Sequence, residues 1–151
     1  MCQLETITRL EQAAAQAIGC EPEEIREETY DNYGLKVFSA YGLEYAIGTD
    51  EQAQEAASEY IKQTLWAFNA SFILSRSKVG YNPEIEKSLK DMQGKLCESA
   101  NSLVEALIED MDEFIEDTIG ADGRGHFLSS YDGNENEIDI DGETFYAYRL
   151  N

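Results

Sequence analysis

Apolar residues near the start of the chain recur at the spacing of one helix face, and Gly19 follows them as a natural C-terminal stop. These residues are Ile7, Leu10, Ala14 and Ile18. The next segment, residues 21–25, combines a proline with early acidic side chains, which is typical of a helix start. The sequence therefore predicts two short helices, the second of which fades over residues 30–34.

Residues 35–48 follow a different pattern, in which aromatic and β-branched residues flank a central glycine, Gly42. This pattern predicts a β-hairpin. A helix is predicted directly after it, because Thr49 and Gln52 form a capping-box pattern ahead of an apolar run that continues to Phe68. That run is the most hydrophobic part of the chain, and we expect it at the centre of the core.

The longest periodic pattern begins after Asn82 and Pro83, a capping residue followed by a residue suited to the first helical position. Its apolar positions follow in steps of four, three and four residues, an eleven-residue period that keeps them in a nearly straight stripe. They are Ile85, Leu89, Met92, Leu96, Ala100, Leu103, Leu107, Met111 and Phe114. Unbroken to Ile119, this helix would be about 55 Å long, and Gly94 is the residue at which it would bend or divide.

The C-terminal segment is predicted to form strands, because two Asp-Gly pairs mark tight turns within it. The expected strands are residues 126–131, 136–140 and 143–150, with turns at Asp132-Gly133 and Asp141-Gly142. The sequence thus predicts a single acidic α+β domain over residues 1–151. Its parts are helices that include a long amphipathic one, a hairpin in the N-terminal half, and a C-terminal antiparallel β-meander.

Charge narrows what such a domain can bind. The chain has 31 Asp and Glu against 11 Lys and Arg, a net charge of −20 at pH 7. This charge opposes direct binding to nucleic acid or to an anionic membrane surface, and it favours a basic protein partner. The cysteines, Cys2, Cys20 and Cys97, are odd in number and widely spaced, which favours reduced thiols in the cytoplasm.

The acids are densest in the second part of the predicted long helix, where no Lys or Arg is interleaved. The candidate partner-binding residues are Glu105, Glu109, Asp110, Asp112, Glu113, Glu116 and Asp117. On one helix they would occupy about 20 Å of axis, near one carboxylate per 3 Å, whereas duplex DNA carries about one charge per 1.7 Å. A rigid rod of this kind could occupy a basic groove that binds phosphates. The simpler interpretation is a solvated helix face, although such faces usually mix charge signs and gain i,i+4 pairs.

Other chemistries find less support in the sequence. The segment Asp132–Glu143 partly matches a calcium loop, but Glu137 stands where that loop needs glycine, and two Asp-Gly turns account for the same residues. His126 is the only histidine, and no nucleophile motif surrounds it. We therefore expect no catalytic residues, no metal and no cofactor.

Three stretches of the chain resemble a known group of proteins. They are DGRGHFLSSYDG at 122–133, FYAYRLN at 145–151 and LWAFN at 65–69. They are similar to segments of small, acidic, uncharacterised proteins of bacteriophages and prophages, and the resemblance implies expression inside an infected bacterium. As a broad class, small acidic phage proteins often resemble nucleic acid and block host enzymes that bind it.

The sequence therefore predicts a non-enzymatic inhibitor in the cytoplasm of an infected or lysogenic bacterial host. It would present its clustered carboxylates, as a nucleic-acid mimic, to a basic nucleic-acid-binding surface of a host defence or transcription protein. Two alternatives stay open: a structural or assembly protein that forms homodimers through the long helix, and a calcium-binding domain.

Overall fold

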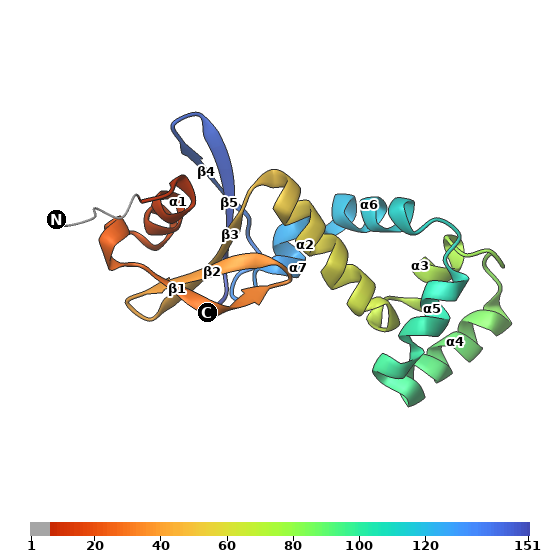
Figure 1. The fold of residues 1–151 in the computed structure, drawn as a ribbon. Coiled ribbons are helices and arrows are strands. Elements are labelled where there is room, and N and C mark those ends of the chain that lie inside the picture. Colours follow the sequence, from red (N-terminus) through yellow and green to blue (C-terminus); the bar gives the residue numbers. More distant parts are fainter. Residues whose placement is uncertain (1–6) are drawn as a thin grey trace. The chain divides into compact units, whose positions relative to one another are not determined.

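The computed structural model describes residues 7–151 (Figure 1). The chain divides into two compact units: the sheet unit, formed by residues 1–57 and 122–151, and the helical unit, formed by residues 58–121. Their helices and strands confirm the predicted α+β class. Within residues 7–151, no helix combines the length and the apolarity that crossing a bilayer requires. The thiols of Cys20 and Cys97 are free, and Cys2 lies outside the described residues.

An antiparallel sheet with the strand order β1-β2-β3-β5-β4 forms the centre of the sheet unit. The strands are β1 (Arg26–Asn32), β2 (Leu35–Ala40), β3 (Leu43–Gly48), β4 (Asn136–Ile140) and β5 (Glu143–Arg149). β2 and β3 confirm the predicted hairpin. Three of the connections are two-residue turns in which both residues have positive φ, as the twist of a hairpin requires. These turns are Tyr33-Gly34, Tyr41-Gly42 and Asp141-Gly142.

Helix α1 (Arg9–Ile18) confirms the first predicted helix and covers one face of this sheet (Figure 1). The hydroxyl oxygen of Thr8 caps its start by accepting a hydrogen bond from the Glu11 amide, and Gly19 ends it at a φ of 89°. The helix packs small side chains against larger ones from four strands. The buried residues of this core are Ala13, Ala14, Phe38, Ile47, Ile138, Phe145 and Ala147.

The second predicted short helix is wrong. Only Pro22–Glu24 forms a 3₁₀ turn, and the chain then enters β1. This strand lies at the edge of the sheet and is largely exposed, so burial imposes no alternation of apolar and polar residues on its sequence. A polar edge strand of this composition is easily mistaken for an acidic helix.

The first strand of the predicted C-terminal meander is also wrong, because residues Arg124–Leu128 form a short helix, α7. Gly125 lies so close to the next loop that an added Cβ would be 2.4 Å from the carbonyl oxygen of Gly133. The hydroxyl oxygen of Ser129, which follows the helix, lies 2.7 Å from the carbonyl oxygen of Arg149. The meander therefore has two strands, β4 and β5, joined by the predicted Asp141-Gly142 turn.

Helix α2 (Asp50–Gln63) confirms the start of the helix predicted after Thr49, but it ends at Gln63 and does not continue to Phe68. The capping box is present: the Gln52 amide donates to the Thr49 hydroxyl at 3.2 Å, and the Thr49 amide donates to the Gln52 side chain at 3.0 Å. The boundary between the two units falls within this helix. In the helical unit α2 is followed by a 3₁₀ turn, Leu65–Ala67, and by α3 (Ala70–Ser75).

The single long helix predicted from residue 83 to residue 119 is wrong. The structure has three helices there, α4 (Pro83–Leu96), α5 (Asn101–Leu107) and α6 (Met111–Asp122), with a 3₁₀ turn at Cys97–Ala100. Gly94 lies inside α4 and breaks nothing. The first break is at Cys97, whose φ is 49°, and it lets Asn101 donate to the Lys62 carbonyl at 2.7 Å and accept from the Trp66 amide at 3.1 Å.

The second break has a similar tertiary cause. Ile108 leaves the helical conformation and forms a β-bridge with Ser77, so that the segment after α5 runs antiparallel to the end of α3. The Lys78 amide donates to the Leu107 carbonyl at 2.9 Å, and the Glu109 amide donates to the Arg76 carbonyl at 3.1 Å. These two bonds take the place of two hydrogen bonds of the expected helix.

Candidate functional site

The seven predicted partner-binding residues do not share one helix face. Glu105 lies on α5, Glu109 and Asp110 lie in the link between α5 and α6, and the remaining four lie on α6. The acids of α6 span only about 7.5 Å of helix axis. The predicted rod of evenly spaced carboxylates is therefore wrong, because the break at Ile108 separates Glu105 on α5 from the acids of α6.

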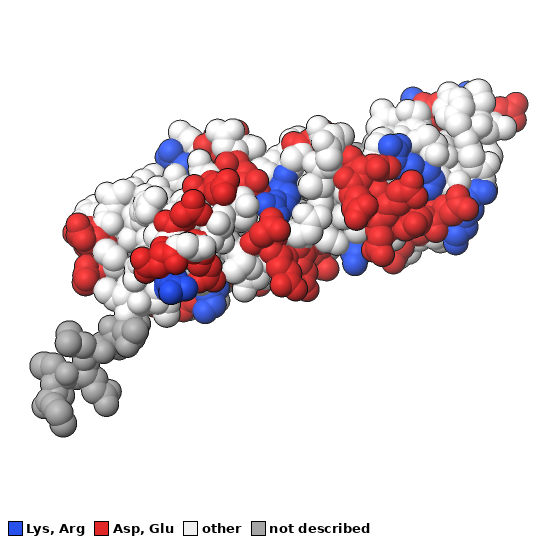
Figure 2. All heavy atoms as spheres, turned by 90° about the horizontal axis from the view of Figure 1, so that it is seen from above, with Lys and Arg blue, Asp and Glu red and all other residues white. Residues whose placement is uncertain are grey.

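Most of these acids are nevertheless exposed and uncompensated. Six are exposed, and among residues 7–151 none of the six takes part in an ion pair. The exception is Asp117, which is partly buried and accepts a charge-assisted hydrogen bond from Arg76 Nε at 2.9 Å. Figure 2 shows Asp and Glu gathered into patches on the face that it presents, with Lys and Arg scattered between them.

An aromatic cluster fixes the position of α6 within the helical unit. Phe114, on α6, is fully buried and meets the rings of Phe68 and Phe72 edge-on, with centroids 5.5 and 5.1 Å away. The Arg76 guanidinium lies 4.0 Å above the Phe72 ring. Arg76 therefore lies between the face of the Phe72 ring and Asp117, next to the acidic residues of α6.

A depression of about 610 Å³ lies beside this arginine. It is lined by Ser75, Arg76, Glu109, Asp110, Met111, Asp112, Glu113 and Phe114. Four carboxylates and one guanidinium give this lining a formal charge of −3. A depression of this size and sign can accommodate a Lys or Arg side chain of a partner.

Three of these acids also have a structural role. The Asp110 carboxylate accepts a hydrogen bond from the Glu113 amide at 3.2 Å and so caps the start of α6. Asp112 and Glu113 lie in the first turn, where negative charge interacts favourably with the helix dipole. The pattern of an Asp followed three residues later by a Glu is a helix-start signal, and it could have located this break from the sequence.

The sequence did not single out Arg124, which forms a charged network in the sheet unit. Its side chain is only 10% exposed and donates to Glu135 and to Asp50, each at 2.7 Å. It also lies 4.7 Å from the centre of the Tyr146 ring. Burial, followed by the hydrogen bond to Glu135, raises the pKa of Tyr148. Glu135 accepts hydrogen bonds from both Arg124 and the Tyr148 hydroxyl, so the network connects α2, α7 and β5. It leaves no free acid or base.

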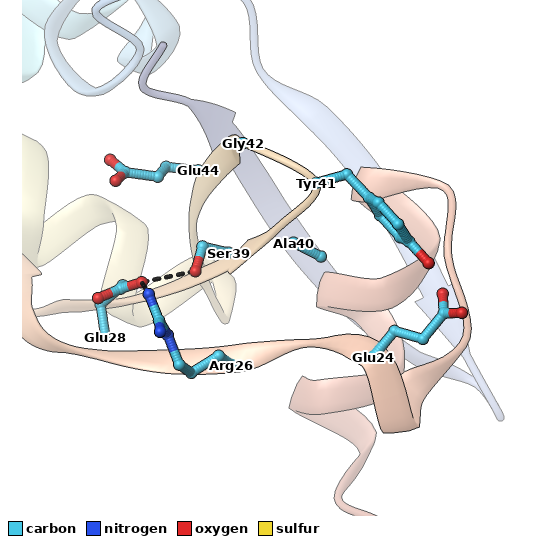
Figure 3. Close-up of a pocket in the computed structure, with 8 residues that line it drawn as sticks. All are labelled: Glu24, Arg26, Glu28, Ser39, Ala40, Tyr41, Gly42 and Glu44. Carbon is cyan, nitrogen blue, oxygen red and sulfur yellow. Dashed lines mark hydrogen bonds and ion pairs between the residues drawn. The ribbon is translucent and has the colours of Figure 1, made fainter.

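A second depression, of about 360 Å³, lies in the sheet unit around β1, β2 and β3 (Figure 3). Hydrogen bonds from Ser39 and Arg26 lower the pKa of Glu28. In Figure 3 the Tyr41 hydroxyl points toward Glu24, and this interaction raises the pKa of Tyr41. The carboxylates of this depression are thus engaged with their own neighbours, in contrast to those of the helical unit.

Within residues 7–151, no group of three or more His, Cys, Asp or Glu side chains is placed to hold a metal ion. The segment Asp132–Glu143, which partly matches a calcium loop, consists of a turn at Asp132, strand β4 and the Asp141-Gly142 turn. The Asn134 amide and the Ser129 hydroxyl both donate to the Asp132 carboxylate and lower its pKa. His126 is exposed on α7, with its ring edge-on to Phe127.

The fold and the site define an acidic α+β protein whose unpaired carboxylates surround a depression on a helical unit. No protein-family model, no curated protein and no solved structure matches the chain. The resemblance to phage proteins and the function inferred from charge therefore stay predictions.

Proposed function

We propose that this chain is a non-enzymatic inhibitor that acts in the cytoplasm of an infected or lysogenic bacterium. It binds a basic, nucleic-acid-binding surface of a host defence or transcription protein. The observation that carries the proposal is the depression of the helical unit, where four of the five positions from 109 to 113 are carboxylates without an ion-pair partner.

Electrostatics favours a cationic occupant at this place. In bulk water, two like charges about 6 Å apart repel each other by about 0.7 kcal/mol. On α6, Asp112 and Glu113 precede Glu116 by four and three positions, the spacing at which Cβ atoms lie about 5–6 Å apart. The lining of the depression has no cation besides Arg76, which Asp117 already engages. A Lys or Arg side chain from a partner removes part of this repulsion and gains charge-assisted hydrogen bonds.

The broken helix changes the kind of mimicry proposed. A regular ladder of carboxylates would match many successive phosphate contacts of a nucleic-acid-binding groove. The observed cluster is compact, so it matches a few Lys or Arg side chains that otherwise contact neighbouring phosphates. The proposed interface is therefore local, and it is centred on Glu109, Asp112 and Glu116.

A pull-down from bacterial lysate tests this function. The test variant carries Glu109→Lys, Asp112→Lys and Glu116→Lys, which spares the capping residue Asp110 and the paired Asp117. The control variant carries Glu137→Lys, Glu51→Lys and Glu55→Lys in the sheet unit. Each triple has one non-helical position, one first-turn position and one mid-helix position, all of them exposed.

We expect the wild-type chain to retain a host protein at low salt and to release it when salt or duplex DNA is added. The control variant should retain most of that protein, whereas the test variant should lose it while keeping its circular dichroism spectrum. Equal retention by the two variants would show that Glu109, Asp112 and Glu116 do not form the binding site. A retained protein that duplex DNA does not displace would argue against nucleic-acid mimicry.

A further inference from the structure

The exposed apolar surface of this protein is concentrated in one segment. Among the described residues, all the exposed large apolar side chains other than tyrosine belong to residues 79–96. They are Val79, Ile85, Met92 and Leu96, with exposed fractions between 37% and 53%. Exposed apolar side chains grouped in this way mark an interaction surface more often than scattered ones do.

Three of these side chains form a stripe along α4. Ile85, Met92 and Leu96 are separated by seven and four residues, so they lie on one side of the helix. Leu89, at the edge of the same stripe, is buried, and Gln93 beside it donates to the carbonyls of Trp66 and Phe68 at 2.8 and 2.7 Å. The helix is thus fixed to its unit along one edge and leaves an apolar stripe without a partner.

The charge of α4 sets it apart from the rest of the chain. The helix carries as many acidic as basic residues, and its net charge is zero, in a protein of net charge −20. The charged residues are Glu84, Glu86, Asp91, Lys87, Lys90 and Lys95. Two copies of so acidic a protein repel each other over most approaches, but not over this helix.

We propose that α4 is a self-association face, on which α4 of a second copy packs in antiparallel orientation. In the register that matches the two stripes, Ile85 faces Leu96 of the second copy, and the two Met92 side chains meet near the two-fold axis. Lys95 then lies about 3 Å along the helix axis from Glu84 of the second copy, on the same flank of the stripe. The two-fold symmetry makes this ion pair twice.

Charge decides between the two orientations. In a parallel pair, the flank that carries Lys95 and Glu84 lies on opposite sides of the interface in the two copies, and the two residues are about 16 Å apart along the axis, so this ion pair does not form. In the antiparallel pair, Lys95 exchanges its present partner Asp91, which it contacts at 2.9 Å in an exposed i,i+4 pair. Such surface pairs contribute little to stability, so the exchange is easy. One pair of short helices buries less area than a standard interface, and the dimer is therefore weak and depends on concentration.

Sedimentation equilibrium of the full chain from about 5 to about 500 µM tests the dimer. We expect the apparent mass of the wild-type protein to rise toward that of a dimer over this range. Met92→Ser combined with Leu96→Ser should keep it monomeric. Tyr41→Asn, which removes a side chain that is 76% exposed in the sheet unit and suits the positive φ there, should associate like the wild type. A wild-type chain that stays monomeric throughout, or a serine variant that still associates, overturns the proposal.

Charge and orientation have their own tests. Lys95→Glu should weaken association more than Lys87→Glu, because residue 87 lies on the side of α4 away from the stripe. For orientation, Cys2, Cys20 and Cys97 are replaced by serine, and Ile85→Cys and Leu96→Cys are introduced together or singly. Upon oxidation only the double variant should form covalent dimers, because position 85 faces position 96 of the other copy. Covalent dimers from the single variants would indicate parallel packing and contradict the proposed arrangement.

These outcomes are independent of the proposed inhibitor function. The α4 variants leave the acids of the depression intact, and the depression variants leave α4 intact. A failure of the dimer in sedimentation therefore does not affect the pull-down, and a failure of the pull-down does not affect the dimer.

Discussion

Replacing Arg124 with methionine should destabilise the protein by about 3 kcal/mol. The Arg124 side chain is 10% exposed and makes three hydrogen bonds, one to Glu135, one to the Asp50 carboxylate and one to the Asp50 carbonyl. Methionine keeps the apolar stem, so the change removes mainly the charge, these bonds and the contact of the guanidinium with the Tyr146 ring.

The magnitude follows from how exposed each partner is. Glu135 is 32% exposed, and a hydrogen bond between charged groups at such a site is worth about 2 kcal/mol. The bond to the Asp50 carbonyl adds about 1 kcal/mol. The Asp50 carboxylate is 75% exposed, so solvent screens its ion pair and we assign it nothing.

Urea unfolding followed by far-ultraviolet circular dichroism measures the effect. Arg26→Met is the matched control, because it makes the same change in the same unit at a side chain that is 79% exposed, and it should cost less than about 1 kcal/mol. If Arg124→Met costs no more than Arg26→Met, the network does not hold the sheet unit together and the reasoning is refuted.

The same experiment tests the prediction of a single domain. The only tryptophan, Trp66, lies in the helical unit, whereas Arg124 lies in the sheet unit. In one cooperative domain, Trp66 fluorescence and circular dichroism report the same midpoint in the variant. A dichroism midpoint that falls while the fluorescence midpoint stays would show that the two units unfold separately.

Three further changes have defined outcomes. Asp110→Ala should cost about 1 kcal/mol in urea unfolding because α6 loses its cap, whereas Asp110→Asn should stay near the wild type. Gly125→Ala should lower the melting temperature, at a cost of about 1–3 kcal/mol, because its Cβ meets backbone atoms, whereas Gly94→Ala, with open space around it, should raise it. Burial raises the pKa of Tyr148, so the stability that its neutral form contributes is fully present below pH 10.0 and is lost as pH rises toward the pKa of the folded state. Between about pH 8 and about pH 11, the free energy of unfolding should therefore decline less in Tyr148→Phe than in the wild type.

Elements with local signals were predictable from the sequence. The Thr49–Gln52 capping box placed the start of α2, and Asn82 followed by Pro83 placed the start of α4. The Asp141-Gly142 pair placed the turn between β4 and β5. In each case residues within one turn of each other decide the conformation, so the sequence contains the whole cause.

The parts that failed depend on contacts between distant residues. Asn101 breaks the long helix because its side chain bonds to backbone atoms about 35 to 39 positions earlier. Ile108 becomes extended because it pairs with Ser77. The periodic apolar pattern continues across both breaks, because residues on either side of a break can be buried without sharing one helix. Periodicity therefore predicted the burial of Ala100 and Phe114 correctly on a helix that does not exist as one piece, but it did not predict that Met92 of the same pattern is exposed.

The candidate site was predictable only in its acidic half. That Glu109 and Asp112 are exposed follows from their charge. That they share a depression with Arg76 does not, because Arg76 is brought there by the bridge between Ser77 and Ile108. The ion pair was not predictable from the sequence either. Asp117 is the one acid of the predicted set with a basic partner, and that partner lies 41 residues away in the sequence.

The two units carry different net charges, so the residues that attract a partner from a distance can be distinguished from the residues that contact it. The sheet unit has 19 acidic and 5 basic residues, a net charge of −14, and the helical unit has 12 and 6, a net charge of −6. A basic partner is therefore drawn by a field that comes mainly from the sheet unit, even where it binds the depression of the helical unit. Long-range attraction acts on the association rate, and contacts act on the dissociation rate. Against the captured partner, the sheet-unit triple variant should thus slow association without changing dissociation, whereas Glu109→Lys with Asp112→Lys and Glu116→Lys should speed dissociation. If both variants changed only the association rate, net charge alone would explain binding and the depression would have no part in it.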